Sequence, residues 1–104
     1  MRVAYSIIRE IHRKNFLPEP NDYGLKEYEF RNFIFLLEQE GFLERVLRAN
    51  DQYSLKPARL TKKGMALLES NKHYEKNYPD RSSLKKWVQV DKRRNSNGAE
   101  EDNI

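Results

Sequence analysis

The chain has 104 residues and no cysteine, and its 20 Lys and Arg residues outnumber its 16 Asp and Glu residues, giving a net charge of +4 and a pI near 9.4. The absence of cysteine excludes a disulfide framework, a thiolate metal site and a cysteine nucleophile. The longest apolar run, residues 33–37, is far too short to span a membrane, and the first residues lack the apolar stretch of a signal peptide. We therefore expect one soluble, cytoplasmic domain with a small core.

The first predicted element is an amphipathic helix that ends near Asn15, because Pro18 and Pro20 cannot continue it. Its apolar face repeats at helical spacing and consists of Val3, Ala4, Ile7, Ile8 and Ile11. We expect its other side to face solvent with Arg2, Arg9, Glu10, His12 and Arg13.

A turn-rich connector follows over residues 16–24, with room for one short helical turn at residues 21–23. The next helix is predicted over residues 26–40, and Gly41 is a natural stop because it can take a left-handed backbone. The buried stripe of this helix has the spacing i, i+3, i+4, i+7 and consists of Phe30, Phe33, Ile34 and Leu37.

Residues 42–60 read as a β-hairpin, because two runs containing apolar residues flank a polar turn at residues 49–52. Pro57 predicts that the second arm is an edge strand or irregular. Thr61 is the expected N-cap of a further helix that ends near Ser70. Gly64 lies inside that helix at a cost in helix propensity, which predicts close packing around it.

The segment that follows predicts a last helical stretch, interrupted by Pro79, that docks on the core. Its large apolar residues are Tyr74, Tyr78, Leu84, Trp87 and Val88. Beyond residue 90 the chain is charged and almost free of large apolar residues, so we expect residues 91–104 to form a disordered tail. The predicted domain is therefore residues 1–90.

The order helix, turn, helix, basic hairpin, capped helix predicts a mostly α, α+β fold of the winged helix-turn-helix type with a C-terminal helical extension. The chain also resembles the YjcQ-like family, small winged-helix proteins of Firmicutes and their prophages. The resemblance rests on residues 21–25, 30–33, 37–42, 60–64 and 67–68. It implies a winged-helix fold and, by analogy, nucleic-acid binding or regulation, without catalytic or ligand residues to carry over.

Our leading hypothesis is a double-stranded DNA-binding regulator of the phage or prophage type. The helix over residues 26–40 would read the major groove through Tyr28, Arg31 and Asn32, with Lys26 at its start. The wing would contact phosphates through Arg45, Arg48, Lys56 and Arg59. Residues 26–41 hold only two cations against four glutamates, which weakens the attraction of this helix to phosphate.

The alternative is a protein-interaction module, for a host protein or a second copy, that uses the outward face of the same helix. Tyr28, Phe35 and Gln39 lie opposite the buried stripe, and exposed aromatic residues surrounded by charge are typical of protein interfaces. A third interpretation buries Tyr28 and Phe35 against the C-terminal segment, whose aromatic residues must pack somewhere.

We expect neither catalysis nor a cofactor, metal or membrane partner. His12 and His73 lie on separate segments without an acidic residue at ligand spacing, and four glycines do not form a phosphate loop. The sequence therefore predicts a binding protein rather than an enzyme.

Overall fold

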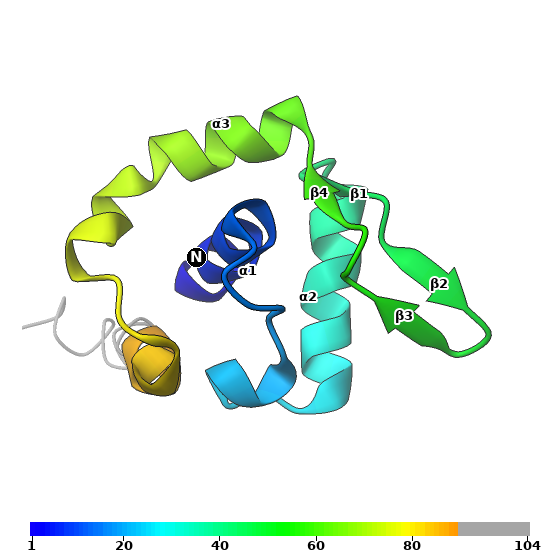
Figure 1. Cartoon of the computed structure of the whole chain (residues 1–104), viewed down its shortest axis with the longest axis horizontal. Coiled ribbons are helices and arrows are strands. Elements are labelled where there is room, and N and C mark those ends of the chain that lie inside the picture. Colours follow the sequence, from blue (N-terminus) through cyan, green and yellow to red (C-terminus); the bar gives the residue numbers. More distant parts are fainter. Residues whose placement is uncertain (90–104) are drawn as a thin grey trace, which may run out of the picture.

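A computed structural model describes residues 1–89 of the chain (Figure 1). Its helices are α1 (Arg2–Arg13), η1 (Pro20–Tyr23), α2 (Glu27–Gln39), α3 (Lys62–Ser70), η2 (Lys72–Asn77) and η3 (Arg81–Ser83), where η marks a 3₁₀ helix. Residues 84–89 continue from η3 as α-helix. The strands are β1 (Leu43–Glu44), β2 (Leu47–Ala49), β3 (Gln52–Ser54) and β4 (Arg59–Leu60). The predicted α+β class is confirmed, while the predicted tail lies outside the described residues.

Helix α1 occupies the middle of the molecule, enclosed by α2, α3 and the C-terminal helical segment (Figure 1). Ile7 and Ile8 are completely buried, as the apolar spacing predicts. Arg9 and Glu10 are buried as well, with 8% and 1% of their surface exposed. The prediction that these two residues face solvent is wrong, because segments distant in the sequence cover the second side of α1. His12 and Arg13 do lie exposed at its end.

Helix α2 has the predicted extent and buries the predicted stripe. Phe30, Ile34 and Leu37 are buried, and Phe33 is half-buried. At the start of the helix, the backbone N–H of Lys26 donates to the Glu29 carboxylate over 2.8 Å. Gly41 ends the helix with a φ of 84°, the left-handed backbone that favours glycine.

The predicted hairpin forms as two short antiparallel ladders, with β1 paired to β4 and β2 paired to β3. Leu43 lies opposite Leu60 at its base, and Ala49 lies opposite Gln52 next to the turn. The ladders are separated by irregular backbone at residues 45–46 and 55–58, the second of which contains Pro57 as predicted. The outer ladder, β2 and β3, projects from the body of the molecule beside α2 (Figure 1).

Helix α3 confirms both local predictions. The Thr61 hydroxyl accepts a hydrogen bond from the N–H of Gly64 over 3.0 Å, which caps the helix. A Cβ atom on Gly64 would lie only 2.2 Å from the carbonyl oxygen of Phe42, so the glycine lets α3 approach the base of the hairpin.

The C-terminal segment docks on the core, as predicted, and the structure places it against α1. Leu84 is completely buried, and the Trp87 ring lies 5.6 Å from the Tyr74 ring and 5.2 Å from the Tyr78 ring. The Tyr74 ring in turn lies 5.2 Å from the ring of Tyr5 on α1. Arg2 at the start of α1 donates a hydrogen bond to the Trp87 carbonyl over 3.0 Å. These contacts join the first helix to the last described segment.

Candidate interaction surface on α2 and the hairpin

The outward face of α2 is open to solvent along the length of the helix. Tyr28 and Phe35 are 60% and 50% exposed, and Asn32 and Gln39 are also exposed. The interpretation that Tyr28 and Phe35 pack under the C-terminal segment is therefore wrong, because the aromatic residues of that segment pack on α1. We call Tyr28, Asn32, Phe35 and Gln39 the α2 face.

Two exposed leucines extend this apolar surface and were missed by the sequence analysis. Leu36 is 55% exposed next to Phe35, and Leu47 on β2 is 56% exposed. The signal for Leu36 was present, because five consecutive apolar residues at positions 33–37 cannot all face one side of a helix. Leu47 lies on a short strand whose residues are all exposed, which period-2 patterning does not reveal.

The hairpin is held against one flank of α2 by an ion pair. Arg48 Nη2 lies 2.5 Å from Glu38 Oε1, and Arg48 Nη1 donates to Glu38 Oε2 over 2.9 Å. The hydrogen bond that Arg48 donates to Glu38 raises the pKa of Arg48 above its ordinary value. On the same flank, the Arg31 guanidinium lies 5.8 Å from the centre of the Tyr53 ring. Arg48 and Arg31 thus connect α2 to β2 and β3.

All eight residues predicted to bind DNA are exposed, but the structure does not gather them into one basic surface. Three of the arginines already have carboxylate partners: Arg31 with Glu27, Arg48 with Glu38 and Arg59 with Glu44. Lys26 and Arg45 pair with no carboxylate within residues 1–89. Lys56 lies apart from the outer ladder and lines a cavity with Phe16 and with Lys14, the residue that follows α1.

The surface formed by α2 and the hairpin is electrically neutral. Residues 26–60 contain six cations and six anions, so their charges cancel. The positive charge of the described chain lies on α1, α3 and the C-terminal segment instead. Any attraction of the α2 face to phosphate must therefore come from the arrangement of individual cations rather than from a net field.

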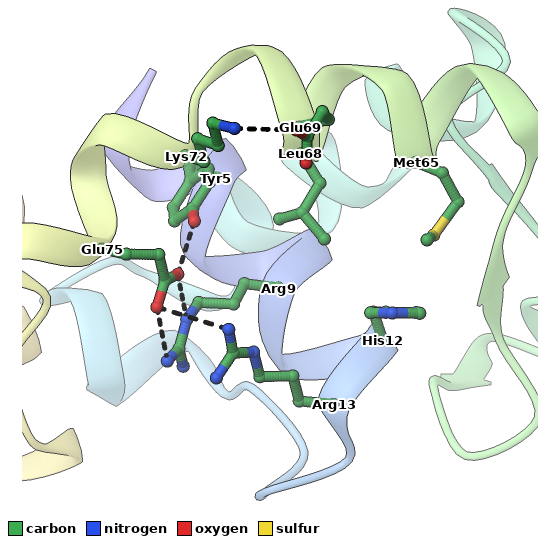
Figure 2. Close-up of a pocket in the computed structure, with 9 residues that line it drawn as sticks. All are labelled: Tyr5, Arg9, His12, Arg13, Met65, Leu68, Glu69, Lys72 and Glu75. Atoms are coloured by element: carbon green, nitrogen blue, oxygen red, sulfur yellow. Dashed lines mark hydrogen bonds and ion pairs between the residues drawn. The ribbon is translucent and has the colours of Figure 1, made fainter.

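A second group of polar residues lies in a cleft of about 340 Å³ between α1, α3 and η2 (Figure 2). Glu75 is its centre. The Tyr5 hydroxyl donates to Glu75 Oε2 over 2.5 Å, and Arg9 donates to both carboxylate oxygens over 2.6 and 3.0 Å. Arg13 approaches Glu75 Oε1 at 3.4 Å. Met65 and Leu68 point into the cleft from α3, with His12 on the wall opposite Met65 (Figure 2).

The same network continues into the core beneath the cleft. Arg9 and the Tyr78 hydroxyl both donate to Glu10 Oε2, over 2.7 and 2.6 Å. The hydrogen bond from Arg9 lowers the pKa of Glu75, while burial and then the hydrogen bond to Glu75 raise the pKa of Tyr5. Burial lowers the pKa of Arg9, but the hydrogen bond to Glu75 and the charges of Tyr78, Glu75 and Glu10 together outweigh burial and raise it. The donors in the cleft are thus used to join α1 to η2.

Within residues 1–89, no group of three or more His, Cys, Asp or Glu residues is arranged to hold a metal ion. None of the helices in this part of the chain is both long and apolar enough to cross a membrane.

Comparison with known proteins gives one informative relative. The chain is 31% identical over 90 residues to the uncharacterized protein YjcQ of Bacillus subtilis (strain 168), a match that covers 84% of this chain and 95% of the relative. No family model matches the chain. No solved structure matches it either.

Proposed function

The chain belongs to the YjcQ-like family, and on that premise we propose that it is a winged-helix protein that binds double-stranded DNA. Helix α2 would be the reading helix, and the β2–β3 hairpin would be the wing. The observation that supports this most directly is the placement of the hairpin beside an α2 face that stays open along the helix. A helix exposed in this way has the shape that a helix-turn-helix protein inserts into the major groove.

The residues available for contact suggest a division of roles. Arg31 fits the paired acceptors of guanine, and Asn32 fits adenine, while Tyr28 is long enough to reach a phosphate. Lys26 and Arg45, which pair with no carboxylate in the described chain, are the cations freest to bind phosphate. Arg48 and Arg59 would have to exchange Glu38 and Glu44 for phosphate oxygens.

The biological role we propose is transcriptional regulation of the phage or prophage type, carried out in the cytoplasm and without catalysis. This role suits a small domain that has a candidate reading helix and, within residues 1–89, no arrangement of groups that we can assign to a reaction. The family supports the winged-helix assignment by resemblance, and the role in regulation follows from DNA binding by analogy.

The first test is a pull-down of sheared genomic DNA from the source by the purified full chain, at about 50 and about 200 mM salt. We expect a discrete sequence to be enriched and to survive the higher salt. Binding without sequence preference that vanishes at the higher salt would show only a general attraction of basic side chains to phosphate, and no sequence-specific regulator. No binding at either salt would contradict it.

Variants of the α2 and hairpin residues separate the two kinds of contact. The double change Lys26→Ala and Arg45→Ala should weaken binding to every sequence and reduce the slope of log affinity against log salt by about 2. Arg31→Ala or Asn32→Ala should instead change the preferred base at one position. Lys76→Ala, which removes an exposed cation from η2, is the matched control and should change neither.

A second candidate function is favoured by the apolar and neutral character of the same surface. Tyr28, Phe35 and Leu36 are each at least half exposed on a surface without net charge, which is typical of a protein interface. Under this candidate, Tyr28→Ala and Phe35→Ala abolish capture of a protein partner. The melting temperature should then stay within a few degrees, because the side chains removed lie at the surface.

A further inference from the structure

The spacing of the α2 face is that of a seam between two helices. Tyr28, Asn32, Phe35 and Gln39 are separated by four, three and four residues, the alternation that keeps a stripe of side chains facing a neighbouring helix. Large rings alternate with side-chain amides along the seam. All four side chains are exposed, so within the described structure the seam has no helix against it.

The flank of the seam carries charges of opposite sign two helical turns apart. Arg31 and Glu38 lie on the side nearest the hairpin, and their side chains are 51% and 23% exposed. Two α2 helices that pair antiparallel about a two-fold axis place Arg31 of one copy beside Glu38 of the other, and the reciprocal contact forms at the same time. A parallel pair would place Leu36 opposite Arg31 and leave the charges unmatched.

We propose that the α2 face pairs with the α2 face of a second copy, antiparallel and about a two-fold axis. The surface formed by residues 26–60 is neutral, so two copies do not repel each other there. The two-fold axis also puts both hairpins on the same side of the helix pair, which brings the exposed Leu47 of each copy to that side. In the dimer, the apolar surface formed by Tyr28, Phe35 and Leu36 of one copy is therefore covered by the same surface of the other copy.

Self-pairing has a consequence for DNA binding, which rests on the function proposed above. Tyr28 and Asn32 belong both to the seam and to the residues assigned to DNA contact. One α2 face cannot be covered by a second copy and lie in a groove at once, so the pair and the DNA complex exclude each other. The species that binds DNA is then the single chain, and self-association lowers the concentration of single chains that can bind DNA.

Sedimentation equilibrium of the full chain without DNA tests the pairing. We expect a monomer–dimer equilibrium, and Phe35→Glu should weaken association by about thirtyfold or more, the effect of a central interface residue. Met65→Glu, which places the same charge at another exposed apolar residue, on α3, should leave association unchanged. A wild-type chain that remains monomeric at every concentration, or equal effects of the two variants, would overturn the pairing.

Charge reversal tests the antiparallel arrangement. Arg31→Glu and Glu38→Arg should each weaken association by about fivefold, since each removes two exposed pairs in the dimer. The chain with both changes should associate like the wild type. Within a single copy the double change places a glutamate at position 31 near Glu27 and an arginine at position 38 near Arg48. Both contacts are repulsive, so only contact between copies explains a rescue. Failure of the double variant to recover would overturn this arrangement.

Addition of a duplex that contains the selected sequence then tests exclusion. We expect the duplex to dissociate the dimer and to bind single chains, each through its own α2 face. A DNA complex that sediments with two chains at one contact site, and that falls to one chain in Phe35→Glu but not in Met65→Glu, would overturn exclusion. A dimer that binds no DNA at all would refute the proposed function and leave the pairing in place.

Discussion

Two regions of this molecule use arginine–glutamate pairs in opposite ways. Between α1 and η2, Arg9 is 8% exposed and donates to Glu75 and to the buried Glu10. At the hairpin, Arg48 of β2 pairs with Glu38 of α2 and Arg59 of β4 pairs with Glu44 of β1, and the two arginine side chains are 43% and 58% exposed. Buried pairs are costly to break because the remaining charge cannot be solvated, whereas exposed pairs contribute little. The first region is therefore held in place, and the second is free to exchange partners.

The largest expected effect comes from breaking the buried pair. Arg9→Ala leaves the buried Glu10 without its guanidinium partner, so we expect it to lower the free energy of unfolding by about 3–5 kcal/mol. Urea unfolding followed by circular dichroism measures the change. Arg59→Ala is the matched control, with an expected loss of no more than about 1 kcal/mol. Similar losses in the two variants would show that burial does not distinguish the regions.

A second variant sharpens the comparison where the two regions meet, at the base of the hairpin. Gly64→Ala places a Cβ atom 2.2 Å from the backbone oxygen of Phe42, so α3 has to move away from the hairpin. We expect a loss of about 1–3 kcal/mol from this overpacking, measured by urea unfolding. Ala66→Gly, at an exposed position of the same helix, provides the control for helix propensity and should cost about 1 kcal/mol. A fully tolerated alanine at position 64 would contradict the close approach.

A pH series isolates the contribution of Glu75 to the buried region. The folded pKa of Glu75 is lowered by Arg9, so its contribution is present above the unfolded pKa of roughly 4.3 and is lost as the pH falls through the folded value. The wild type should therefore lose stability below about pH 4.3, and Glu75→Gln should lose less over the same range. The midpoint of urea unfolding across that range provides the measurement. Parallel pH profiles would argue against this role of Glu75.

The smallest effect is expected from the exposed region itself. Arg48→Ala should lower the free energy of unfolding by no more than about 1 kcal/mol, although its guanidinium lies 2.5 Å from Glu38. A double-mutant cycle with Glu38→Ala gives the coupling energy of the pair directly. A coupling of several kcal/mol would mean that the hairpin is fixed to α2 as firmly as η2 is to α1.

Much of the fold could be predicted because its signals are local. The stripe of α2, the stop at Gly41, the cap at Thr61 and the tight packing at Gly64 all depend on neighbours within a few residues or on backbone preferences. The outward positions of Tyr28 and Phe35 follow from the same helical period that predicts the stripe. The irregular backbone around Pro57 follows from the missing N–H of proline.

What could not be predicted depends on contacts between distant parts of the chain. Analysis of a single helix assumes one buried face, but α1 is covered on a second side by η2, so Arg9 and Glu10 are buried. The partner of Arg9 is Glu75, 66 residues away, and no spacing rule connects the two. The pairing of Arg48 with Glu38 depends in the same way on how the hairpin folds back along α2, which hydrophobic patterning does not specify.

The central position of α1 also bears on how this protein is made. Arg2 bonds to Trp87 and Tyr5 bonds to Glu75, so α1 is synthesised well before the segment that covers its surface. Until residues 84–88 are synthesised, the nascent chain lacks Leu84, Trp87 and Val88, three buried members of its core. Folding of this domain is therefore a single event that follows the synthesis of residue 88, rather than a stepwise process.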